Sequence, residues 1–369
     1  MDTWRTVSFV NRDTPLTITT EPIDLDSCFK EDEVVIEVYS CALNSIDSML
    51  HHAAVPPLSS SKPKSIGSDF SGIIIRKGNV VSDHWSIGDK VNGMIATLYD
   101  SHGTASHFLI LNPDKVETIG HIEPSLCAPQ DKFNQFDLAA AWPMVFCTAC
   151  GPIFSPGRDW SKIEQVLIIG ASTQVANCMV QILKNHLNIK TVVGICNGNS
   201  IEENKSLGFD HLVSYNNGKT LSNVRHLMKT KLDGKKFDVI LDSCGSNDFL
   251  PVMNEFLKPT ETNSYYSTVV GDNCFSYTSS STIQILKERL IIEPYRRFNP
   301  FRTYNYYWNM GLPNRKSFEL GNELISSGKF HPKIDSVYTF EDFQSAVTRM
   351  DTQKSKGKII IQIKRPQDH

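Results

Sequence analysis

The chain has 369 residues, with 37 Lys and Arg against 40 Asp and Glu, which gives a formal net charge of -3. This length exceeds what one small core needs and predicts two domains. A content of 40% apolar and 21% charged residues is typical of a globular protein. The small net charge excludes a global field that attracts nucleic acid. No run approaches the roughly 18 apolar residues of a membrane span, so we expect neither a nucleic-acid partner nor a transmembrane segment.

The nine cysteines are scattered and odd in number. This pattern favours free thiols in a reducing compartment over a disulfide framework. The amino-terminal residues lack the basic start and apolar stretch of a secretory signal. Arg5 and Arg12 among hydroxyl residues are typical of mitochondrial import, whereas Asp2 and Asp13 argue against a strong transit peptide. We therefore expect an intracellular protein.

The first part of the chain reads as strands and turns. Residues 34–39 and 72–75 are rich in β-branched and aromatic residues, which favour strands. Turn signals at 77–79 and 87–89 follow at short spacing. The region ending near Pro143 is therefore predicted to be mainly β.

The pattern changes after Gly151. Residues 166–169 form a continuous apolar run, as in a strand buried on both faces of a parallel sheet. The next segment has an apolar helical stripe through Val175, Met179 and Ile182. Further segments then alternate between predicted strands at 191–196, 212–213, 237–241 and 264–270 and predicted helices at 200–207, 220–232 and one ending near 257. This alternation predicts a doubly wound parallel sheet of the α/β class.

Residues 283–310 interleave arginines with aromatic residues. Three interpretations stay open: a lid over a substrate cleft, a surface that docks on a lipid monolayer, or an insertion packed on its own domain. On the docking interpretation, Phe301, Tyr306 and Trp308 are the expected contacts. A helix at 318–327 and a strand at 358–363 follow.

The turn after the strand at 166–169 begins at Gly170. A strand that enters a helix through a tight glycine turn directs N–H groups at an anion, most often a pyrophosphate. Thr173, Gln174 and Ala176 stand where further glycines are expected. On this loop alone, a nucleotide site and a merely structural turn are equally supported.

A family resemblance covers nearly the whole chain. The motifs that carry it occur in the expected order, at residues 42–47, 66–72, 85–91, 139–143, 170–176, 237–245 and 357–361. Together they resemble the medium-chain dehydrogenase/reductase superfamily, in its zinc-free, quinone-oxidoreductase-like branch. Residues 141–143, 193–196, 256–259 and 334–338 resemble the fungal YIM-type group within that branch.

The resemblance implies a GroES-like catalytic domain at 1–143 and 318–369, with a Rossmann-type dinucleotide-binding domain at 144–317. It implies an active site in the cleft between domains, where a nicotinamide meets a small-molecule substrate. It also implies hydride transfer from NADPH to a quinone or to the β-carbon of an activated alkene, with a polar group stabilising the developing oxygen charge.

Zinc-using relatives need a Cys where Asn44 stands, a His where Ser68 stands, and a third ligand near Met144. Because these three residues do not supply a catalytic zinc site, we expect no zinc. Asn44 is the candidate for orienting the substrate or the nicotinamide amide. Asp47, the second catalytic candidate, is more often a structural residue that caps the following helix.

The expected cofactor is NADP(H). The second strand of the sheet ends at Asn197 without the Asp or Glu that binds the ribose of NAD. Asn197, Asn199 and Tyr215 could surround a 2′-phosphate, although Glu202 and Glu203 would repel it and weaken binding. The remaining candidate contacts, which follow the family pattern, are Thr148, Gly170, Ala171, Ser172, Thr173, Gln174, Val175, Gly245 and Gly271.

Two short motifs have a structural interpretation. Cys147 and Cys150 have the spacing of a redox pair, but they fall where the family has small residues in an interdomain helix. His51 and His52 are interpreted as a polar helix end, because no third metal ligand lies nearby in sequence.

Two functions follow as hypotheses. The first is an NADPH-dependent reductase of quinones or α,β-unsaturated carbonyls. The second is a degenerate, non-catalytic family member that acts at lipid droplets or mitochondria or in a stress (DNA-damage) response, motivated by the missing loop glycines. The resemblance implies a lipid-droplet and mitochondrial location, with the cytoplasm otherwise expected, and leaves a homodimer open. The sequence does not name the substrate.

Overall fold

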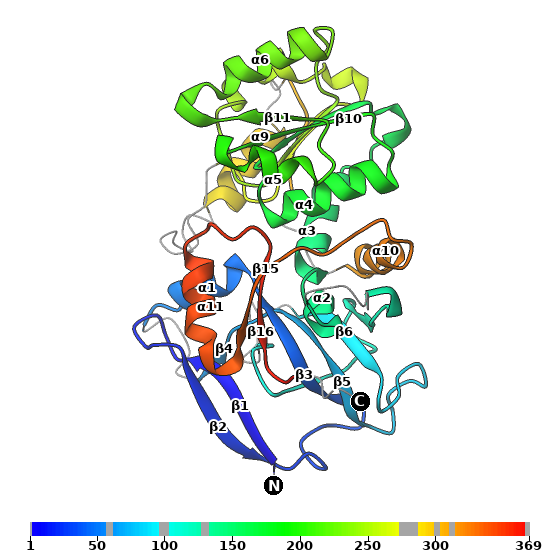
Figure 1. Cartoon of the computed structure of the whole chain (residues 1–369), viewed down its shortest axis with the longest axis vertical. Helices are drawn as coiled ribbons and strands as arrows, with labels where there is room; N and C mark the ends of the chain where they lie inside the picture. The colour runs from blue at the N-terminus through cyan, green and yellow to red at the C-terminus, as the bar shows by residue number, and fades with distance from the viewer. Residues whose placement is uncertain are drawn as a thin grey trace. The chain divides into compact units, whose positions relative to one another are not determined.

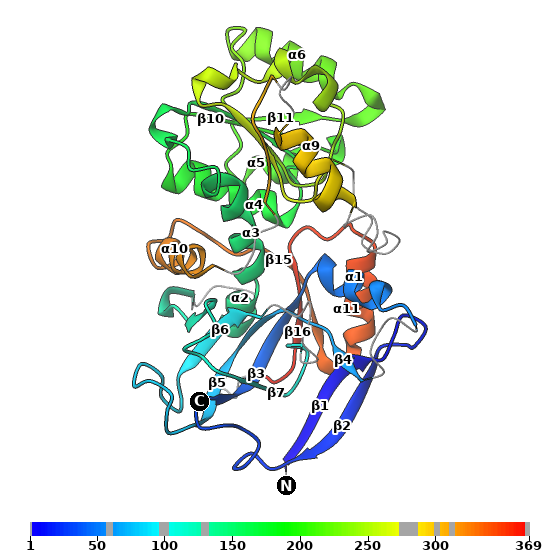
Figure 2. The same cartoon turned by 180° about the vertical axis from the view of Figure 1, so that it is seen from behind.

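The computed structural model describes residues 2–56, 62–95, 103–126, 133–272, 287–298, 303–309 and 314–365. These residues form two compact units. The first unit contains the described residues up to Met144 and those from 314 onward, and the second contains those between them. Helix α3 (Pro143–Phe154) contains the point of division. Figure 1 labels the elements of both units, and Figure 2 shows them from behind.

The first unit is built on two β-sheets, as its β-rich sequence predicts, and their strand pairs are antiparallel except for β15 with β16. Its larger sheet has the order β15-β16-β3-β5-β6-β8, with β7 also paired to β3. These strands are β3 (Val34–Leu43), β5 (Asp69–Lys77), β6 (Lys90–Met94), β7 (Phe108–Leu111), β8 (Ile119–His121), β15 (Ile334–Thr339) and β16 (Lys358–Gln362). A smaller sheet has the order β2-β1-β4, from β1 (Asp2–Phe9), β2 (Thr17–Ile23) and β4 (Lys64–Ser65).

The two ends of the chain meet in the larger sheet. Strand β16 pairs antiparallel with β3, which places Ile359 opposite Leu43 and Ile361 opposite Cys41. The apolar run of β16 is buried because it lies between β15 and β3 rather than at an edge. The helices of this unit are α1 (Ser45–Ala53), α2 (Gln135–Ala140), α10 (Arg315–Ser326) and α11 (Phe343–Asp351). Helices α1 and α11 lie side by side, where Ser48 donates a hydrogen bond to Asp351.

The second unit is a parallel sheet with the order β11-β10-β9-β12-β13-β14. Its strands are β9 (Gln165–Ile169), β10 (Thr191–Cys196), β11 (His211–Ser214), β12 (Val239–Asp242), β13 (Tyr265–Thr268) and β14 (Tyr306–Trp308). Counted from β9, this is the order 3-2-1-4-5-6 of a dinucleotide-binding fold. Within the described residues, its α-helices besides α3 include α4 (Gln174–Gln181), α5 (Ile201–Lys205), α6 (Thr220–Lys231), α7 (Met253–Phe256) and α9 (Glu293–Phe298). The predicted α/β class, with a doubly wound parallel sheet, is confirmed.

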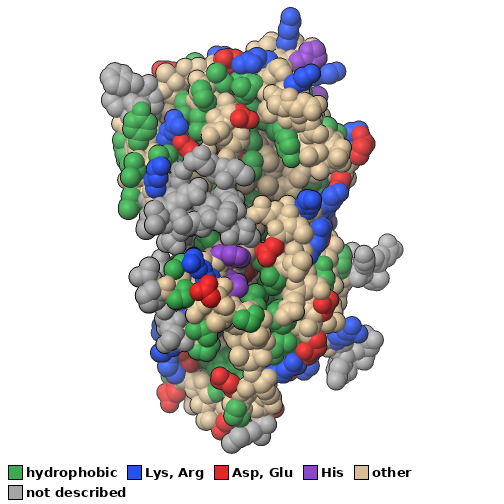
Figure 3. All heavy atoms as spheres, turned by 90° about the vertical axis from the view of Figure 1, so that its left-hand side faces the viewer, with side chains coloured by type: hydrophobic (Ala, Val, Ile, Leu, Met, Phe, Trp, Pro, Cys, Tyr) green, Lys and Arg blue, Asp and Glu red, His purple; other side chains and the backbone are tan. Residues whose placement is uncertain are grey.

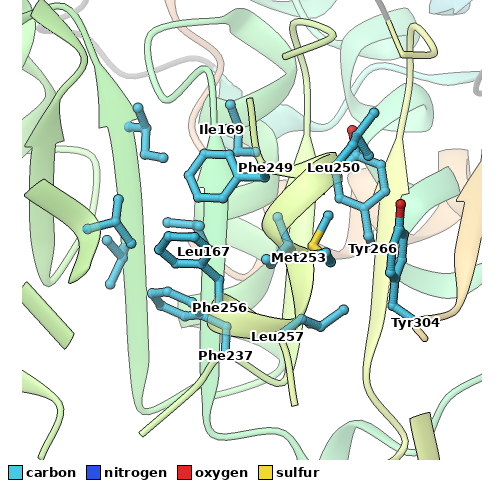
Figure 4. Packing of buried hydrophobic residues seen from close by; sticks show 14 of the residues in the cluster. Leu167, Ile169, Phe237, Phe249, Leu250, Met253, Phe256, Leu257, Tyr266 and Tyr304 are labelled. Atoms are coloured by element: carbon cyan, nitrogen blue, oxygen red, sulfur yellow. The ribbon is translucent and has the colours of Figure 1, made fainter. Parts of the chain in front are cut away.

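The core of the second unit packs on the middle strands of this sheet. Figure 4 shows Leu167 of β9 beside the rings of Phe249 and Phe256, with Tyr266 of β13 nearby. The rings of Phe249 and Phe256 meet edge to face, with centroids 4.9 Å apart. Burying one such side chain contributes about 1.5–3 kcal/mol, so this cluster is a main source of the unit's stability.

The basic-aromatic segment contributes the last strand of the sheet. In β14, Tyr306 is 1% and Trp308 is 7% exposed. The Tyr306 hydroxyl donates to Asp272, and the Trp308 indole N–H donates to the carbonyl of Val269. The expectation that Tyr306 and Trp308 dock on lipid is therefore wrong, because both side chains pack inside the fold; Phe301 lies outside the described residues.

One described stretch is long and apolar enough to cross a membrane. It runs from Gln135 to Phe154, and 83% of its apolar window is buried within the fold. Helices α2 and α3 together form this stretch. A core helix of a globular protein meets the same criteria of length and composition and is also mostly buried.

We predict that Gly321→Ala destabilises the first unit. A Cβ at this α10 position would clash with Cζ3 of Trp142 and lie 3.0 Å from Cη2 of the same ring, which is fully buried and stacked on Phe318. Alanine normally favours a helix interior by about 1 kcal/mol, but overpacking a rigid core costs about 1–3 kcal/mol. We therefore expect a net loss of about 1 kcal/mol in urea denaturation. Glu319→Ala, at an exposed position of the same helix, is the control, and a G321A variant as stable as wild type would contradict the packing argument.

Candidate functional site

A buried polar cluster forms where three neighbouring strands of the first unit begin or end. Asn44 follows β3, Asp69 begins β5 and Lys358 begins β16, and strand pairing brings the three together. Lys358 Nζ donates to Asn44 Oδ1 at 2.5 Å and to Asp69 Oδ2 at 2.8 Å. The Met144 N–H donates to Asp69 Oδ1 at 2.8 Å. Lys358 and Asp69 are 1% and 0% exposed, so this is a fully buried ion pair.

Asn44 is engaged within this cluster through both ends of its amide. Its Oδ1 accepts from Lys358, while its Nδ2 donates to Asp69 Oδ2 at 2.9 Å and, at 3.4 Å, to the carbonyl of Ala42. The amide proton that is weakly held by Ala42 remains for a ligand. The predicted role of Asn44 in orienting a ligand stays a prediction.

Asp47 holds the start of α1. Its carboxylate accepts the N–H of Asn44 at 2.7 Å and the N–H of Gly67 at 2.9 Å. Burial raises the pKa of Asp47 to about 6, although the two backbone donors and Lys358 act in the opposite direction. This geometry is that of the expected helix cap. A direct catalytic role for Asp47 stays a prediction.

The donor set of this cluster does not fit a catalytic zinc ion. The side-chain oxygens of Asn44 and Asp69 already accept from the Lys358 ammonium, whose charge would repel a metal cation. Burial raises the pKa of the neighbouring Cys41 to about 12, which keeps its thiol protonated. Within the described residues, no group of three or more His, Cys, Asp or Glu side chains could hold a metal. No chemical step is therefore assigned to zinc.

In the second unit, the turn after β9 is tied to the turn after β12. Gly170 has φ +85°, and a Cβ there would lie 2.7 Å from Ser243 Oγ, so glycine is required. Ser243 Oγ donates to the carbonyl of Ile169 at 2.9 Å and accepts from Thr173 Oγ1 at 2.8 Å. Thr173 Oγ1 also caps α4 by accepting the N–H of Ala176 at 3.0 Å. Thr173, which stands where a further loop glycine is expected, thus accepts one backbone N–H of the first turn of α4.

A buried carboxylate shapes the turn after β12. Asp242 accepts the N–H groups of Cys244, Gly245 and Ser246 at 2.8–2.9 Å, and the Tyr266 hydroxyl at 2.8 Å. Burial raises the pKa of Asp242, and these four donors oppose the rise. The turn is therefore fixed independently of any ligand.

The turn after β13 is fixed in a similar way. Thr268 Oγ1 accepts the N–H of Gly271 at 3.1 Å. Gly245 and Gly271 have φ values of +78° and +93°, which favour glycine. Both lie at carboxyl ends of strands, as Gly170 does, and this is the edge where ligands bind in open α/β sheets. Within the described residues, Thr148 on α3 makes no side-chain hydrogen bond to these turns.

The predicted ribose-end residues come together after β10 and β11. Asn197 Oδ1 accepts the N–H of Asn199 at 3.0 Å, and Asn197 Nδ2 donates to the Tyr215 hydroxyl at 3.3 Å. Asn216 was missed from the sequence: its Oδ1 accepts the N–H of Gly198 at 3.0 Å. The Asn-Asn-Gly turn at 216–218 is the signal that could have found it. The resulting group is polar and carries no carboxylate.

Contacts in the same region alter two of the expectations. Ser172 Oγ accepts from Asn204 Nδ2 at 2.8 Å, so this predicted cofactor contact already has an internal partner. Glu202, expected to repel a phosphate, forms an ion pair with Lys205, with Oε1 and Nζ 2.5 Å apart. Its repulsion is therefore weaker than the sequence indicates.

The two short motifs with structural interpretations behave as expected. Cys147 and Cys150 are buried thiols within α3. His51 and His52 lie in the last turn of α1, where their rings approach the carbonyl oxygens of Thr14 and Ser48.

The residues that sequence reasoning missed in the first unit are Asp69 and Lys358. A lysine at the start of an otherwise apolar buried strand was the available signal, because a buried charge needs a partner. The sequence does not say which carboxylate provides it.

We predict that Asp47 makes the stability of the protein decrease as pH rises. Because its folded-state pKa of about 6 lies above the usual 3.8, the folded state binds more protons between these values. Its contribution is fully present below pH 4 and is lost as pH rises through 6. About two pKa units correspond to about 3 kcal/mol.

Urea denaturation between pH 4 and 8 measures this contribution as the difference between wild type and Asp47→Asn. Asp47→Ser is the matched variant, since it removes titration without placing an amide N–H₂ against the backbone donors. Neither variant should show the decrease in stability between pH 4 and 8 that we expect for wild type. Stability profiles that run parallel to that of wild type across this pH range would show that Asp47 is not the titrating group.

Comparisons with known proteins agree with this architecture. Residues 30–122 match a model described as an alcohol dehydrogenase GroES-like domain, and residues 207–361 match one described as a zinc-binding dehydrogenase. Protein YIM1 of Saccharomyces cerevisiae is 42% identical over 360 residues, which cover 98% of each chain. The resemblance to the fungal YIM-type group is thus confirmed.

Solved structures show the same fold at low identity. A quinone oxidoreductase from Coxiella burnetii is 18% identical, with TM-score 0.70, over 98% of this chain and 100% of its own. The human synaptic vesicle membrane protein VAT-1 homolog-like protein is 20% identical, with TM-score 0.68, over 99% of each chain. A short chain alcohol dehydrogenase from E. coli CFT073, complexed with cofactor NADH, is 15% identical, with TM-score 0.71, over 98% of this chain and 99% of its own. The chain belongs to the medium-chain dehydrogenase/reductase superfamily.

Proposed function

We propose that the protein is a zinc-independent, NADP(H)-dependent reductase of quinones or α,β-unsaturated carbonyls. The observation that carries this proposal is the second unit's strand order, with Gly170, Gly245 and Gly271 at the carboxyl ends of three adjacent strands. A dinucleotide binds at such an edge, with its pyrophosphate near the first turn. The quinone class is supported by the fold shared with the Coxiella burnetii quinone oxidoreductase.

The residues of this chain supply binding, orientation and electrostatics, and the nicotinamide supplies the hydride when bound. Gly170 admits the backbone approach that a pyrophosphate needs, while Ser243 and Asp242 keep the neighbouring turns in place. In the first unit, the Asn44 amide offers a weakly held proton to a ligand. Hydride transfer to an enone or quinone builds negative charge on oxygen, which a nearby cation or hydrogen-bond donor stabilises.

The preference for NADP(H) follows from the ribose end. The residues gathered there, Asn197, Asn199, Tyr215 and Asn216, donate or accept neutral hydrogen bonds. A ribose 2′-hydroxyl is normally bound by a carboxylate, and none ends β10. A 2′-phosphate can accept several neutral donors, but without a paired cation the affinity is modest.

We predict that NADPH raises the thermal stability of the purified protein and that NADH raises it less. A specific ligand at a hundredfold excess over its dissociation constant adds about 2.7 kcal/mol. Asn197→Asp keeps the acceptor for Asn199 but places a charge at the ribose end. It should weaken NADPH binding about tenfold (~1.4 kcal/mol) without weakening NADH binding.

Nucleotide fluorescence titration and thermal unfolding measure both effects. Gly170→Ala, which places a methyl group against Ser243, is the control that should reduce binding of both nucleotides. No stabilisation at millimolar NADPH would refute the reductase proposal.

A second function, association with a lipid surface, is favoured by one observation. Along η8 (Glu288–Ile292) and α9, four apolar side chains are exposed by 59–73%: Leu290, Ile291, Tyr295 and Phe298. Arg297 lies beside them, with its guanidinium 5.6 Å from the Phe298 ring centroid. Hydrophobic side chains also gather beside Lys and Arg side chains at the upper left of Figure 3. Apolar and basic residues on one helix are typical of a helix that lies in a lipid interface.

We predict that the triple variant L290S/Y295S/F298S abolishes flotation of the protein with phospholipid-coated oil droplets. The double variant V80S/I87S is the control. It also replaces exposed apolar side chains, since Val80 and Ile87 are 65% and 63% exposed, but these two residues lie in the first unit. It should float like wild type. Equal flotation of wild type and the triple variant would rule out this helix as the docking surface.

A further inference from the structure

The Asn44 amide is held in one orientation by two partners of opposite character. A lysine ammonium only donates hydrogen bonds, and an ionised carboxylate only accepts them. Lys358 therefore selects Oδ1, and Asp69 selects Nδ2, at 2.5 and 2.9 Å. An isolated asparagine amide can be turned by 180° with little change in shape. Here the reverse orientation would set N–H₂ against ammonium and oxygen against carboxylate.

The cost of this arrangement indicates what it does. Taking the Lys358 and Asp69 charges out of water is unfavourable, and a buried ion pair often stabilises a fold no better than apolar residues would. Such pairs are retained most clearly where they specify one arrangement among several. Within this cluster, the arrangement specified is the direction of the Asn44 amide.

We propose that Lys358 is a positioning residue for the reaction, because together with Asp69 it fixes which end of the Asn44 amide a ligand meets. This inference rests on the proposed function for its catalytic meaning. With both partners in place, Asn44 offers a ligand the Nδ2 proton that is held at 3.4 Å by the carbonyl of Ala42. Without Lys358, Oδ1 loses its donor and the amide is held through Nδ2 alone, by Asp69.

The alternative is that Lys358 only compensates the charge of Asp69. A pair of variants separates the two roles. Lys358→Met leaves Asp69 as an uncompensated buried charge and should lower stability strongly. The double variant K358M/D69N removes both charges and keeps an oxygen acceptor for the Met144 N–H.

The double variant also changes what the Asn44 amide meets. With its oxygen turned to the Met144 N–H, the amide introduced at position 69 presents its N–H₂ group to Asn44. That donor selects Asn44 Oδ1 where the carboxylate selected Nδ2. The Asn44 amide is therefore reversed while the fold is kept.

Steady-state assays with NADPH and a soluble 1,4-naphthoquinone give the first test. In K358M/D69N we expect near-wild-type thermal unfolding and NADPH affinity, with kcat reduced about 10–100-fold, as for other residues that orient a ligand-binding group. Lys358→Arg, which keeps a donor-only cation, should recover part of kcat. Recovery of kcat together with stability in the double variant would overturn the proposal in favour of charge compensation alone.

A second readout does not depend on turnover. In protein labelled with ¹⁵N-asparagine, the side-chain amide signals of Asn44 are assigned from their absence in Asn44→Ser. Their chemical shifts should change in Lys358→Met, which removes the donor to Oδ1, and their protection from exchange should fall in K358M/D69N, which removes the carboxylate that accepts from Nδ2. Signals indifferent to Lys358 would refute the positioning role. If wild type shows no NADPH-dependent turnover but the Asn44 signals depend on Lys358, the proposed function fails and the positioning stands.

Discussion

The reversal of strand order between β9 and β12 is the constraint on which the nucleotide-binding unit depends. These two strands are neighbours in the sheet, yet the chain leaves β9 toward β10 and leaves β12 toward β13. Their turns therefore diverge, and Ser243 and Thr173 bind them together across the divergence. Position 170 requires glycine because a Cβ there would lie 2.7 Å from Ser243 Oγ. The side chains that stabilise this edge thus also leave little freedom in the turn that a ligand would meet.

Charged groups in the interior of both units are used in the same way. Asp242 accepts four hydrogen bonds and fixes a turn, while Asp69 accepts from Lys358, Asn44 and a backbone N–H and fixes a side chain. Each buried carboxylate has partners for its lone pairs, which offsets the cost of desolvation. The interior charges therefore specify local geometry rather than add net stability.

Local patterns in the sequence were sufficient to predict the parallel sheet of the second unit. The apolar run at 166–169 and the alternation after it predict β9 and its neighbours, because buried parallel strands have few polar residues. Strand β14 was not predicted from the sequence. Its three residues are too few to show the alternation of a strand, and its aromatic residues are also compatible with a docking surface. The pairing of Lys358 with Asp69 was not predicted, because 289 positions separate the two residues. Ser172 was predicted as a cofactor contact, but the sequence does not show that Asn204 already donates to its hydroxyl.

The place of β16 between β15 and β3 has a consequence for synthesis on the ribosome. Strands β3 and β5 emerge early, whereas the strand that separates β3 from β15 and carries Lys358 emerges among the last residues described. Domains fold as units while the chain grows, so the parallel sheet can form while the first unit still lacks a central strand. Until then Asp69 lacks Lys358, and residues 40–43 of β3 lack their β16 partner, an open edge of the kind that favours aggregation. Assembly of the polar cluster is thus a late event that reports the addition of β16 to the sheet.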